Sequence, residues 1–487
     1  MTNANDPEFG RKCQKIIVFG CVLAGNAVIW SSSAMAEDWV FAPYVGISEQ
    51  YTDNAFSTAS DRKGDFITSL NAGFALNKDG NHLQLRSEYD GSYDIYSKYS
   101  DLNGFRHNLL AGANAELVPE HLFVDSQIAF TEQTLTRSGN TTIVDRTVSG
   151  DRTRILNTRI SPYYMQNFGG AATGIARYTY SRVDFFDAGV GSTTTNPNNS
   201  ETNQIDLTMQ SGSDFSRTKW AVEGLLLDNQ VDSGNDLRRA SIKGTGQMPI
   251  NNKVAALGTV GWDEFDGENI DNEEISGAFY GGGVRLTPGP RTDFSIQVGH
   301  RYGGGVVDAD LTYLISTEAL FFARYNVDIQ GAGQSLANTD VLDRNGELVN
   351  PNVVSGGYVD SITKAKTFTM GVSGVKGRNT YSGSGSYVER EFLDDGTNDT
   401  VAAIDARYAR QLSRQLEFTL GGGYSEVLDS QVAGQKDSTY YGQTGLNYQF
   451  TATVSGSLSY SYFERNSETD TDDLRENTVS VSLRKTF

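Results

Sequence analysis

Four histidines are the residues of this chain that titrate most readily near neutral pH, and none of them belongs to a recognisable catalytic motif. A Ser–His or Asp–His pair catalyses hydrolysis only when the imidazole lies within hydrogen-bond reach of its partner. His82 and His121 lie in or beside predicted tight turns, and His107 and His300 lie within predicted strands. The chain has no Gly-x-Ser-x-Gly arrangement. We therefore predict that it is not an enzyme and that each histidine is a surface or pore-lining residue.

Two acidic stretches, 263–274 and 468–473, offer oxygen ligands of the kind that Ca²⁺ binds. Neither stretch matches a calcium-loop motif, and solvated charge that keeps exposed loops soluble explains both of them better. The two cysteines, Cys13 and Cys21, fall within a segment that we expect to be cleaved, which excludes a disulfide framework or a Cys-ligated metal in the mature chain. We predict no metal site and no cofactor.

Charged residues recur at every second position in several segments, opposite apolar or aromatic residues. In 82–96 the apolar set is Leu83, Leu85, Tyr89, Tyr93 and Ile95. A β-strand sends alternate side chains to opposite faces, so the charges of each segment share one face. Because a Lys or Arg facing lipid at mid-bilayer costs about 2 to 4 kcal/mol, this face is expected to point into a pore. The predicted pore-lining residues are Arg86, Glu88, Asp90, Asp94, Arg324, Asp328, Asp405 and Arg407.

About 22 segments of this kind, with 18 to 22 as the expected range, run along the chain, and their connections alternate between tight and long. Tight connections such as 78–81, 118–121 and 376–379 contain Gly, Asn or Pro, which suit turn conformations. Long connections include 187–200 and 330–361. This pattern predicts an all-β fold, namely a transmembrane antiparallel up-and-down β-barrel of the bacterial outer-membrane type. We found no repeat of fixed period, which disfavours a solenoid or a propeller.

Both ends of the chain agree with this fold. Basic residues precede an apolar run over 16–30, and Ala34-Met35-Ala36 supplies the small residues of a cleavage site. We therefore predict a secretory signal peptide over 1–36 and the barrel domain over 37–487. The last strand ends on Phe487, which resembles the assembly signal of outer-membrane barrels, although Lys485 replaces the usual apolar residue. No plug domain is expected before the first strand, so any constriction should come from a loop.

The charge balance narrows the possible partners. The chain has 40 basic and 60 acidic residues, a formal charge of -20, and a nucleic-acid partner is not expected. The expected location is the outer membrane of a Gram-negative bacterium, with both termini on the short-turn, periplasmic side. The expected partners are outer-membrane lipid, lipopolysaccharide and the barrel-assembly machinery.

The segment from Asp38 to Asn54, together with Asp65-Phe66-Ile67, resembles the opening of a family of putative outer-membrane β-barrel porins. This family includes outer-membrane proteins associated with PEP-CTERM/exosortase systems. The resemblance covers about thirty residues, and Asn71-Ala72-Gly73 departs from the Pro-Gly often found in the family's second strand. It implies a channel or scaffold that serves exopolysaccharide export, with exopolysaccharide or proteins of an export complex as further partners.

Three functions remain open from the sequence. The first is a channel or porin for surface polysaccharide or small solutes. The second is a structural or adhesive surface barrel that contacts the extracellular matrix through loops such as Ser192 to Asn203, and the third and least favoured is a barrel enzyme. Loops longer than about 15 residues tend to be functional. We therefore predict that part of Gln330 to Ser361 folds into the pore, which would place Asp340, Asp343, Arg344 and Glu347 near Arg324 and Asp328. A surface excursion is the alternative for this loop.

Overall fold

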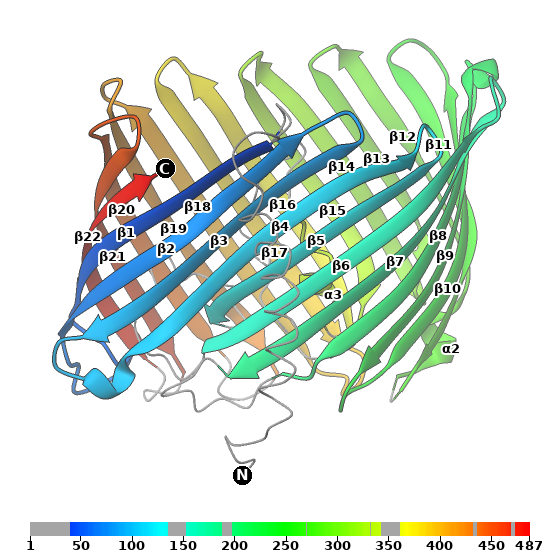
Figure 1. Ribbon diagram of the computed structural model, residues 1–487. Helices are drawn as coiled ribbons and strands as arrows, with labels where there is room; N and C mark the ends of the chain where they lie inside the picture. Colours follow the sequence, from blue (N-terminus) through cyan, green and yellow to red (C-terminus); the bar gives the residue numbers. More distant parts are fainter. Residues whose placement is uncertain are drawn as a thin grey trace.

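The chain forms one closed sheet of 22 strands, shown in Figure 1. The computed structural model describes residues 39–134, 152–187, 197–268, 270–331, 333–341, 361–431, 436–468 and 473–487. The strands are Trp39–Thr52 (β1), Asp65–Asp79 (β2), Leu83–Tyr96 (β3), Gly104–Val118 (β4), Leu122–Thr134 (β5), Arg152–Asn167 (β6), Ala172–Asp187 (β7), Ser200–Ser211 (β8), Lys219–Val231 (β9), Leu237–Pro249 (β10), Val254–Gly267 (β11), Gly277–Gly289 (β12), Thr292–Arg301 (β13), Gly304–Ser316 (β14), Ala319–Gln330 (β15), Thr363–Lys376 (β16), Asn379–Phe392 (β17), Asn398–Gln411 (β18), Leu416–Ser430 (β19), Asp437–Gln449 (β20), Val454–Ser467 (β21) and Leu474–Thr486 (β22).

Each strand pairs antiparallel with the strand that follows it in the chain, as an up-and-down barrel requires. The ring closes where β1 pairs with β22, in a register that runs from Tyr44 opposite Thr486 to Thr52 opposite Thr478. Closure leaves no free sheet edge, which is the condition for a sheet to stand in lipid. The predicted all-β barrel and its strand number are confirmed.

The alternation of side chains along the strands explains why this sequence forms a barrel. On β1, Val45 and Ile47 are each 49% exposed, whereas Tyr44 and Gln50 are 3% and 1% exposed. The same alternation places apolar residues on the outside of β22, where Val479, Val481 and Leu483 all remain exposed. Lipid takes up this exposed apolar face, and the polar residues between them face the interior.

The connections have the predicted alternation of lengths. Except for 212–218 between β8 and β9, the turns that lead from even-numbered to odd-numbered strands contain two to four residues, and two of them contain Gly169 and Gly377 in the left-handed region. One turn on the opposite end is equally short: Tyr302 and Gly303 join β13 to β14 with φ values of 55° and 73°. Two successive positive φ values are typical of a tight hairpin turn. The β13–β14 hairpin is therefore shorter than its neighbours at the end of the barrel that carries the long connections.

In the part of the chain that the structure describes, the connections between strands contain only short helical turns. They are the 3-10 turns Ser100–Leu102 (η1) and Ser213–Phe215 (η2) and the single α-helical turns Asn272–Ile275 (α2) and Gln334–Ala337 (α3). In Figure 1, α3 lies within the outline of the barrel. Within the described residues, no helix has the length and hydrophobicity needed to cross a bilayer.

The first strand starts and the last strand ends at the short-turn end of the barrel (Figure 1). The backbone N–H of Phe487 donates to the carbonyl of Pro43 at 2.9 Å, which adds one rung beyond the last paired residue of β22. The Phe487 side chain is 64% exposed. The predicted signal peptide over 1–36 lies outside the described residues.

Candidate lumen constriction

The described first part of the connection after β15 crosses the interior of the barrel. A Cβ added to Gly331 would lie 2.3 Å from Asn229 Oδ1 on β9, and one added to Gly333 would lie 2.0 Å from Ser200 Oγ on β8. Ten residues beyond Gly331, Val341 packs with Leu110 of β4 and Ala129 of β5. In a ring of 22 strands, β4 and β15 are eleven positions apart. Residues 331 and 333–341, which we call the crossing segment, therefore pass over the inner face of β4 to β9.

The middle of the crossing segment docks in an apolar seat, which is formed by the side chains of Ile155, Val183 and Phe185 on the barrel wall. Leu336 and Ala337 of α3 form a buried cluster with Ile155 on β6 and with Val183 and Phe185 on β7. The exposed fractions in this cluster range from 0% to 6%. Three apolar residues on the inward face of a barrel would be unfavourable if water surrounded them, and Leu336 covers them.

Two amides of the wall hold the backbone of the crossing segment. Gln127 on β5 donates to the Thr339 carbonyl at 3.2 Å and accepts from the Val341 N–H at 3.0 Å. Asn157 on β6 donates to the Leu336 carbonyl at 2.5 Å. These bonds satisfy backbone groups that lack a partner in regular secondary structure. The barrel wall thus binds the backbone of the crossing segment as well as its apolar side chain.

An ion pair completes the docking and corrects part of the sequence prediction. Asp340 accepts from the guanidinium of Arg159 on β6, and that guanidinium also donates to the Ala337 carbonyl at 3.4 Å. The sequence placed Asp340 near Arg324 and Asp328 of β15, which is wrong. The apolar seat on β6 and β7 carries the segment away from β15 before Asp340 is reached. Asp343, Arg344 and Glu347, predicted for the same place, lie outside the described residues.

A second group of contacts joins strands at the same end of the barrel. This mouth cluster has an apolar part formed by Leu237, Phe265, Ile275, Tyr302, Ile329 and Ile362. These residues come from β10, β11, α2, the β13–β14 turn, β15 and the residue before β16. Tyr302 of the short β13–β14 hairpin thus packs among the ends of β10, β11 and β15.

Charged groups lie against the apolar part of the mouth cluster. Arg239 on β10 pairs with Asp263 at 3.3 Å and with Asp328 at 3.2 Å, and Arg301 pairs with the same Asp263 at 2.6 Å. The hydroxyl of Tyr302 accepts from Arg239 at 2.9 Å. Burial and the nearby Asp328 carboxylate raise the pKa of Tyr302, which lies in the turn outside the strands, so the hydroxyl stays protonated.

Asp263 is therefore a buried ion-pair residue and not part of a solvated acidic loop, as its sequence context had suggested. The sequence grouped it with the acidic stretch 263–274, yet it belongs to β11 and its side chain is 2% exposed between two guanidinium groups. Of the later residues in the stretch, Asp271 accepts from the Glu274 N–H at 3.1 Å and so caps α2. Within the described residues, no group of three or more His, Cys, Asp or Glu side chains is placed to hold a metal ion.

The predicted pore-lining residues of β3 lie at three levels of the strand. Arg86, near the short-turn end, pairs with Asp79 at 2.7 Å. Glu88 lies 4.0 Å from Arg484 of β22, and Asp90 accepts from the hydroxyl of Tyr44 on β1. Asp94 is buried and pairs with Arg106 of β4 at 2.7 Å. Glu88 and Asp90 thus belong to one group of contacts with β1 and β22.

The other four predicted residues lie elsewhere on the ring. Arg324 pairs with Asp310 of β14 at 2.9 Å, and Asp328 belongs to the mouth cluster. Asp405 accepts from the Ser384 hydroxyl of β17. Arg407 is exposed and lies opposite Ser382 in the β17–β18 register. The structure therefore does not bring the eight predicted residues together into one site.

Sequence reasoning missed the wall residues that receive the crossing segment. Ile155, Val183 and Phe185 occupy the inward positions of their strands, where the barrel pattern calls for polar residues. Ile155 and Phe185 each have an apolar neighbour of the other parity, so the segments 155–156 and 185–186 are apolar on both faces, whereas Val183 lies between Arg182 and Asp184. This break in the alternation was the available signal, since an inward apolar patch needs a cover.

Comparisons with known proteins identify the fold. No family model matches the chain, and no curated protein matches it. Solved structures that resemble it include the FrpB iron transporter from Neisseria meningitidis, with a TM-score of 0.52, 12% identity and coverage of 93% of this chain and 82% of that one. The siderophore receptor PirA from Acinetobacter baumannii gives 0.50, 10%, 94% and 81% for the same quantities. The ferric enterobactin receptor PfeA from Pseudomonas aeruginosa gives 0.50, 9%, 94% and 81%.

At these identities the likeness concerns the fold alone. The architecture is a closed 22-strand antiparallel barrel of the outer-membrane type, which supports a location in the bacterial outer membrane. A link to exopolysaccharide systems finds no confirmation in these comparisons.

Proposed function

We propose that the chain is an outer-membrane channel whose lumen is narrowed by the crossing segment. One observation carries this proposal: Leu336 and the backbone around it dock on inward side chains of β5, β6 and β7. A barrel of 16 to 18 strands already leaves an aqueous channel, and one of 22 strands usually has a plugged lumen. A loop that docks across so wide a lumen can restrict the passage of solutes.

Charge pairs on the wall support a passage for polar solutes. Arg86 is paired with Asp79, and Arg324 is paired with Asp310. Paired charges present both donors and acceptors and create little net potential. Sugars and other polar solutes, which carry many hydroxyl groups, match such a wall.

The finer part of the proposal concerns cargo. The resemblance of Asp38 to Asn54 to porins of exopolysaccharide systems supports surface polysaccharide as the exported class, with small solutes as the more general one. The iron and siderophore cargo of the similar solved structures is not carried over, because the likeness is one of fold. A polysaccharide that enters the lumen should block ion current, so oligosaccharides added to one side of a bilayer should lower the current.

The proposal includes an orientation and no catalytic step. The short turns and both termini face the periplasm, and the long connections, the crossing segment and the mouth cluster face outward. Outer-membrane lipid, lipopolysaccharide and the barrel-assembly machinery are the partners that such a barrel needs.

Single-channel recording of the full chain in planar bilayers tests the channel. Leu336→Asp places a charge in the apolar seat and should release the crossing segment, which raises the conductance or the open fraction severalfold. Asn338→Asp adds the same charge two residues away at an exposed position and should behave like the parent chain. Unchanged conductance of Leu336→Asp in a folded barrel would contradict the constriction and favour a structural or adhesive surface barrel.

A further inference from the structure

The seam between β1 and β22 is the place where the barrel wall has least covalent support. Among the 22 described strands, these two are the only neighbours in the ring that are not consecutive in the chain. Every other adjacent pair is tied by its own connection. The seam therefore depends on backbone pairing and on side-chain contacts that cross it.

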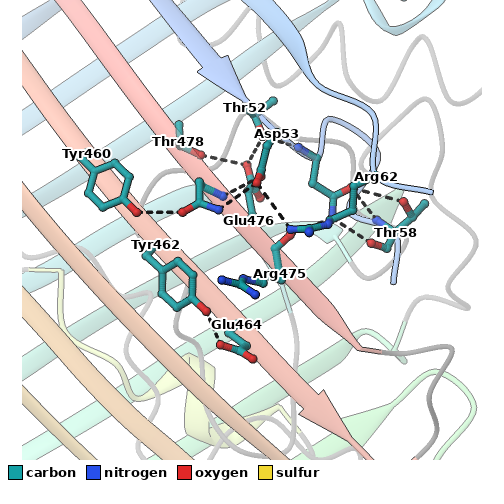
Figure 2. Close-up of polar contacts among 12 residues, drawn as sticks. Thr52, Asp53, Thr58, Arg62, Tyr460, Tyr462, Glu464, Arg475, Glu476 and Thr478 are labelled. Carbon is teal, nitrogen blue, oxygen red and sulfur yellow. Dashed lines mark hydrogen bonds and ion pairs between the residues drawn. The ribbon is translucent and has the colours of Figure 1, made fainter. Parts of the chain in front are cut away.

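At the long-connection end, side chains from both strands meet (Figure 2). Thr52 of β1 donates to Glu476 Oε1 of β22 at 2.8 Å, and Thr478 donates to the same oxygen at 3.0 Å. All three side chains are buried, with 0%, 7% and 3% exposed. Next to them, the Asp53 carboxylate accepts from the backbone N–H and the side-chain amide of Asn477, both at 2.8 Å.

The connection after β1 folds back onto this group. The Asn54 amide donates to the Arg475 carbonyl of β22 at 3.0 Å and to the Thr58 carbonyl at 2.9 Å. Its oxygen accepts from the Thr58 N–H at 3.0 Å, and Arg62 lies 3.5 Å from the Asp53 carboxylate. One fully buried asparagine thus binds its own loop and the opposite strand together.

A second group crosses the seam nearer the short-turn end. The guanidinium of Arg484 on β22 lies 3.3 Å from the centre of the Tyr44 ring on β1, and Tyr44 donates its hydroxyl to Asp90 on β3. The ring reaches β3 by passing over Gly73 of β2, where a Cβ would lie 2.5 Å from the tyrosine oxygen. Cation–π stacking and the hydrogen bond link β22, β1 and β3.

We propose that these two groups form a seam latch that holds the first and last strands together. The part at the long-connection end consists of Thr52, Asp53 and Asn54 with Glu476 and Asn477. The part nearer the short-turn end consists of Tyr44 with Arg484 and Asp90. The latch keeps the wall from opening sideways, so that cargo moves along the barrel axis. The statement about cargo rests on the proposed channel, whereas the latch itself does not.

Thermal unfolding of the full chain, extracted from membranes, tests the latch. The double variant Asp53→Ala/Glu476→Ala should lose the folded, heat-modifiable form at a temperature several degrees below that of the parent chain. Asp395→Ala is the matched control, because Asp395 also accepts two hydrogen bonds, from Thr397 N at 2.8 Å and Oγ1 at 2.7 Å, but within a turn that joins consecutive strands. A double variant that unfolds at the parent temperature would refute the latch.

Two alternative disulfides, each made in its own variant and each using a cysteine at position 48, distinguish support of the seam from a general stiffening of the wall. Ser48 lies opposite Ser482 across the seam and opposite Ser69 within the β1–β2 pair. In the double variant, Ser48→Cys/Ser482→Cys should restore the unfolding temperature, and Ser48→Cys/Ser69→Cys should not. Equal rescue by both disulfides would count against the latch.

Solute flux into liposomes tests whether solutes move along the barrel axis. The parent chain locked by the seam disulfide should pass solutes at the parent rate, because the axial path remains open. Loss of flux on cross-linking would overturn the axial route, and absence of flux in the unlinked parent would count against the channel itself. The two failures are thus distinguishable.

Discussion

The docking of Leu336 allows a quantitative prediction for the opening of the lumen. Its side chain is 4% exposed and packs against Ile155, Val183 and Phe185. Shortening a buried leucine to alanine costs about 2 to 5 kcal/mol, and the low end applies where the surroundings can adjust. Because α3 is a single helical turn, we take about 2 kcal/mol, which corresponds to roughly a 30-fold larger ratio of undocked to docked segment.

Single-channel recordings measure this ratio as the time spent in the higher-conductance state divided by the time spent in the lower-conductance state. Leu336→Ala should increase it about 30-fold by the estimate above. Asn157→Ala removes one hydrogen bond to the Leu336 carbonyl, worth about 1 kcal/mol, and should increase it about fivefold. Asn338→Ala, at an exposed position of the same segment, should leave it unchanged.

The order of these effects is the decisive result. If Asn157→Ala opened the channel as strongly as Leu336→Ala, the apolar seat would not be the main anchor. If neither changed the occupancy of the higher-conductance state, the crossing segment would not limit conduction, and the assignment of the constriction would have to be abandoned.

Three further predictions concern topology, assembly and stability. Cysteine at Asn252, in an exposed short turn, should be labelled only from the periplasm and cysteine at Asp395 only from outside intact cells; reversed labelling would invert the orientation. Deletion of Phe487, which removes its bond to Pro43, should lower the amount of membrane-embedded, heat-modifiable protein; normal amounts would show that the terminal residue is dispensable. Asp263→Ala leaves the guanidinium groups of Arg239 and Arg301, whose side chains are 9% and 22% exposed, without their shared carboxylate and should destabilise the barrel by about 3 kcal/mol in urea unfolding, whereas Asp266→Ala, exposed on the same strand, should cost less than about 1 kcal/mol; equal effects would contradict the burial argument.

The strands could be predicted from the sequence because the bilayer imposes a rule on every one of them. Each lipid-facing residue must be apolar while its neighbours need not be, so the alternation in 82–96 or 454–463 reports a strand without help from the rest of the chain. The turn at Tyr302 and Gly303 was harder to locate. A positive φ at a tyrosine is uncommon, and the run of glycines after Tyr302 does not indicate which two residues form the turn.

The site was less accessible because it depends on contacts between residues far apart in the chain. Entry of part of the connection after β15 into the lumen was predicted from its length, with a surface excursion as the alternative, but its docking surface was not predicted. Asp340 could have paired with any inward arginine, and Arg159 is selected because the Leu336 seat on β6 and β7 lies beside it. The mouth cluster depends in the same way on contacts between distant parts of the chain, since Tyr302 of the β13–β14 turn meets Arg239 of β10 and Asp328 of β15 there.

Combining the two structural elements separates axial from lateral passage. The seam disulfide Ser48→Cys/Ser482→Cys acts on β1 and β22, whereas Leu336→Ala acts on β6 and β7, and the two sites share no contact among the described residues. Distant changes without shared partners have additive effects. If cargo moves along the axis, Leu336→Ala should therefore raise solute flux by the same factor with the seam locked as with the seam free. A disulfide that abolished this increase would mean that the released segment opens a path through the wall, and the latch would then be a gate.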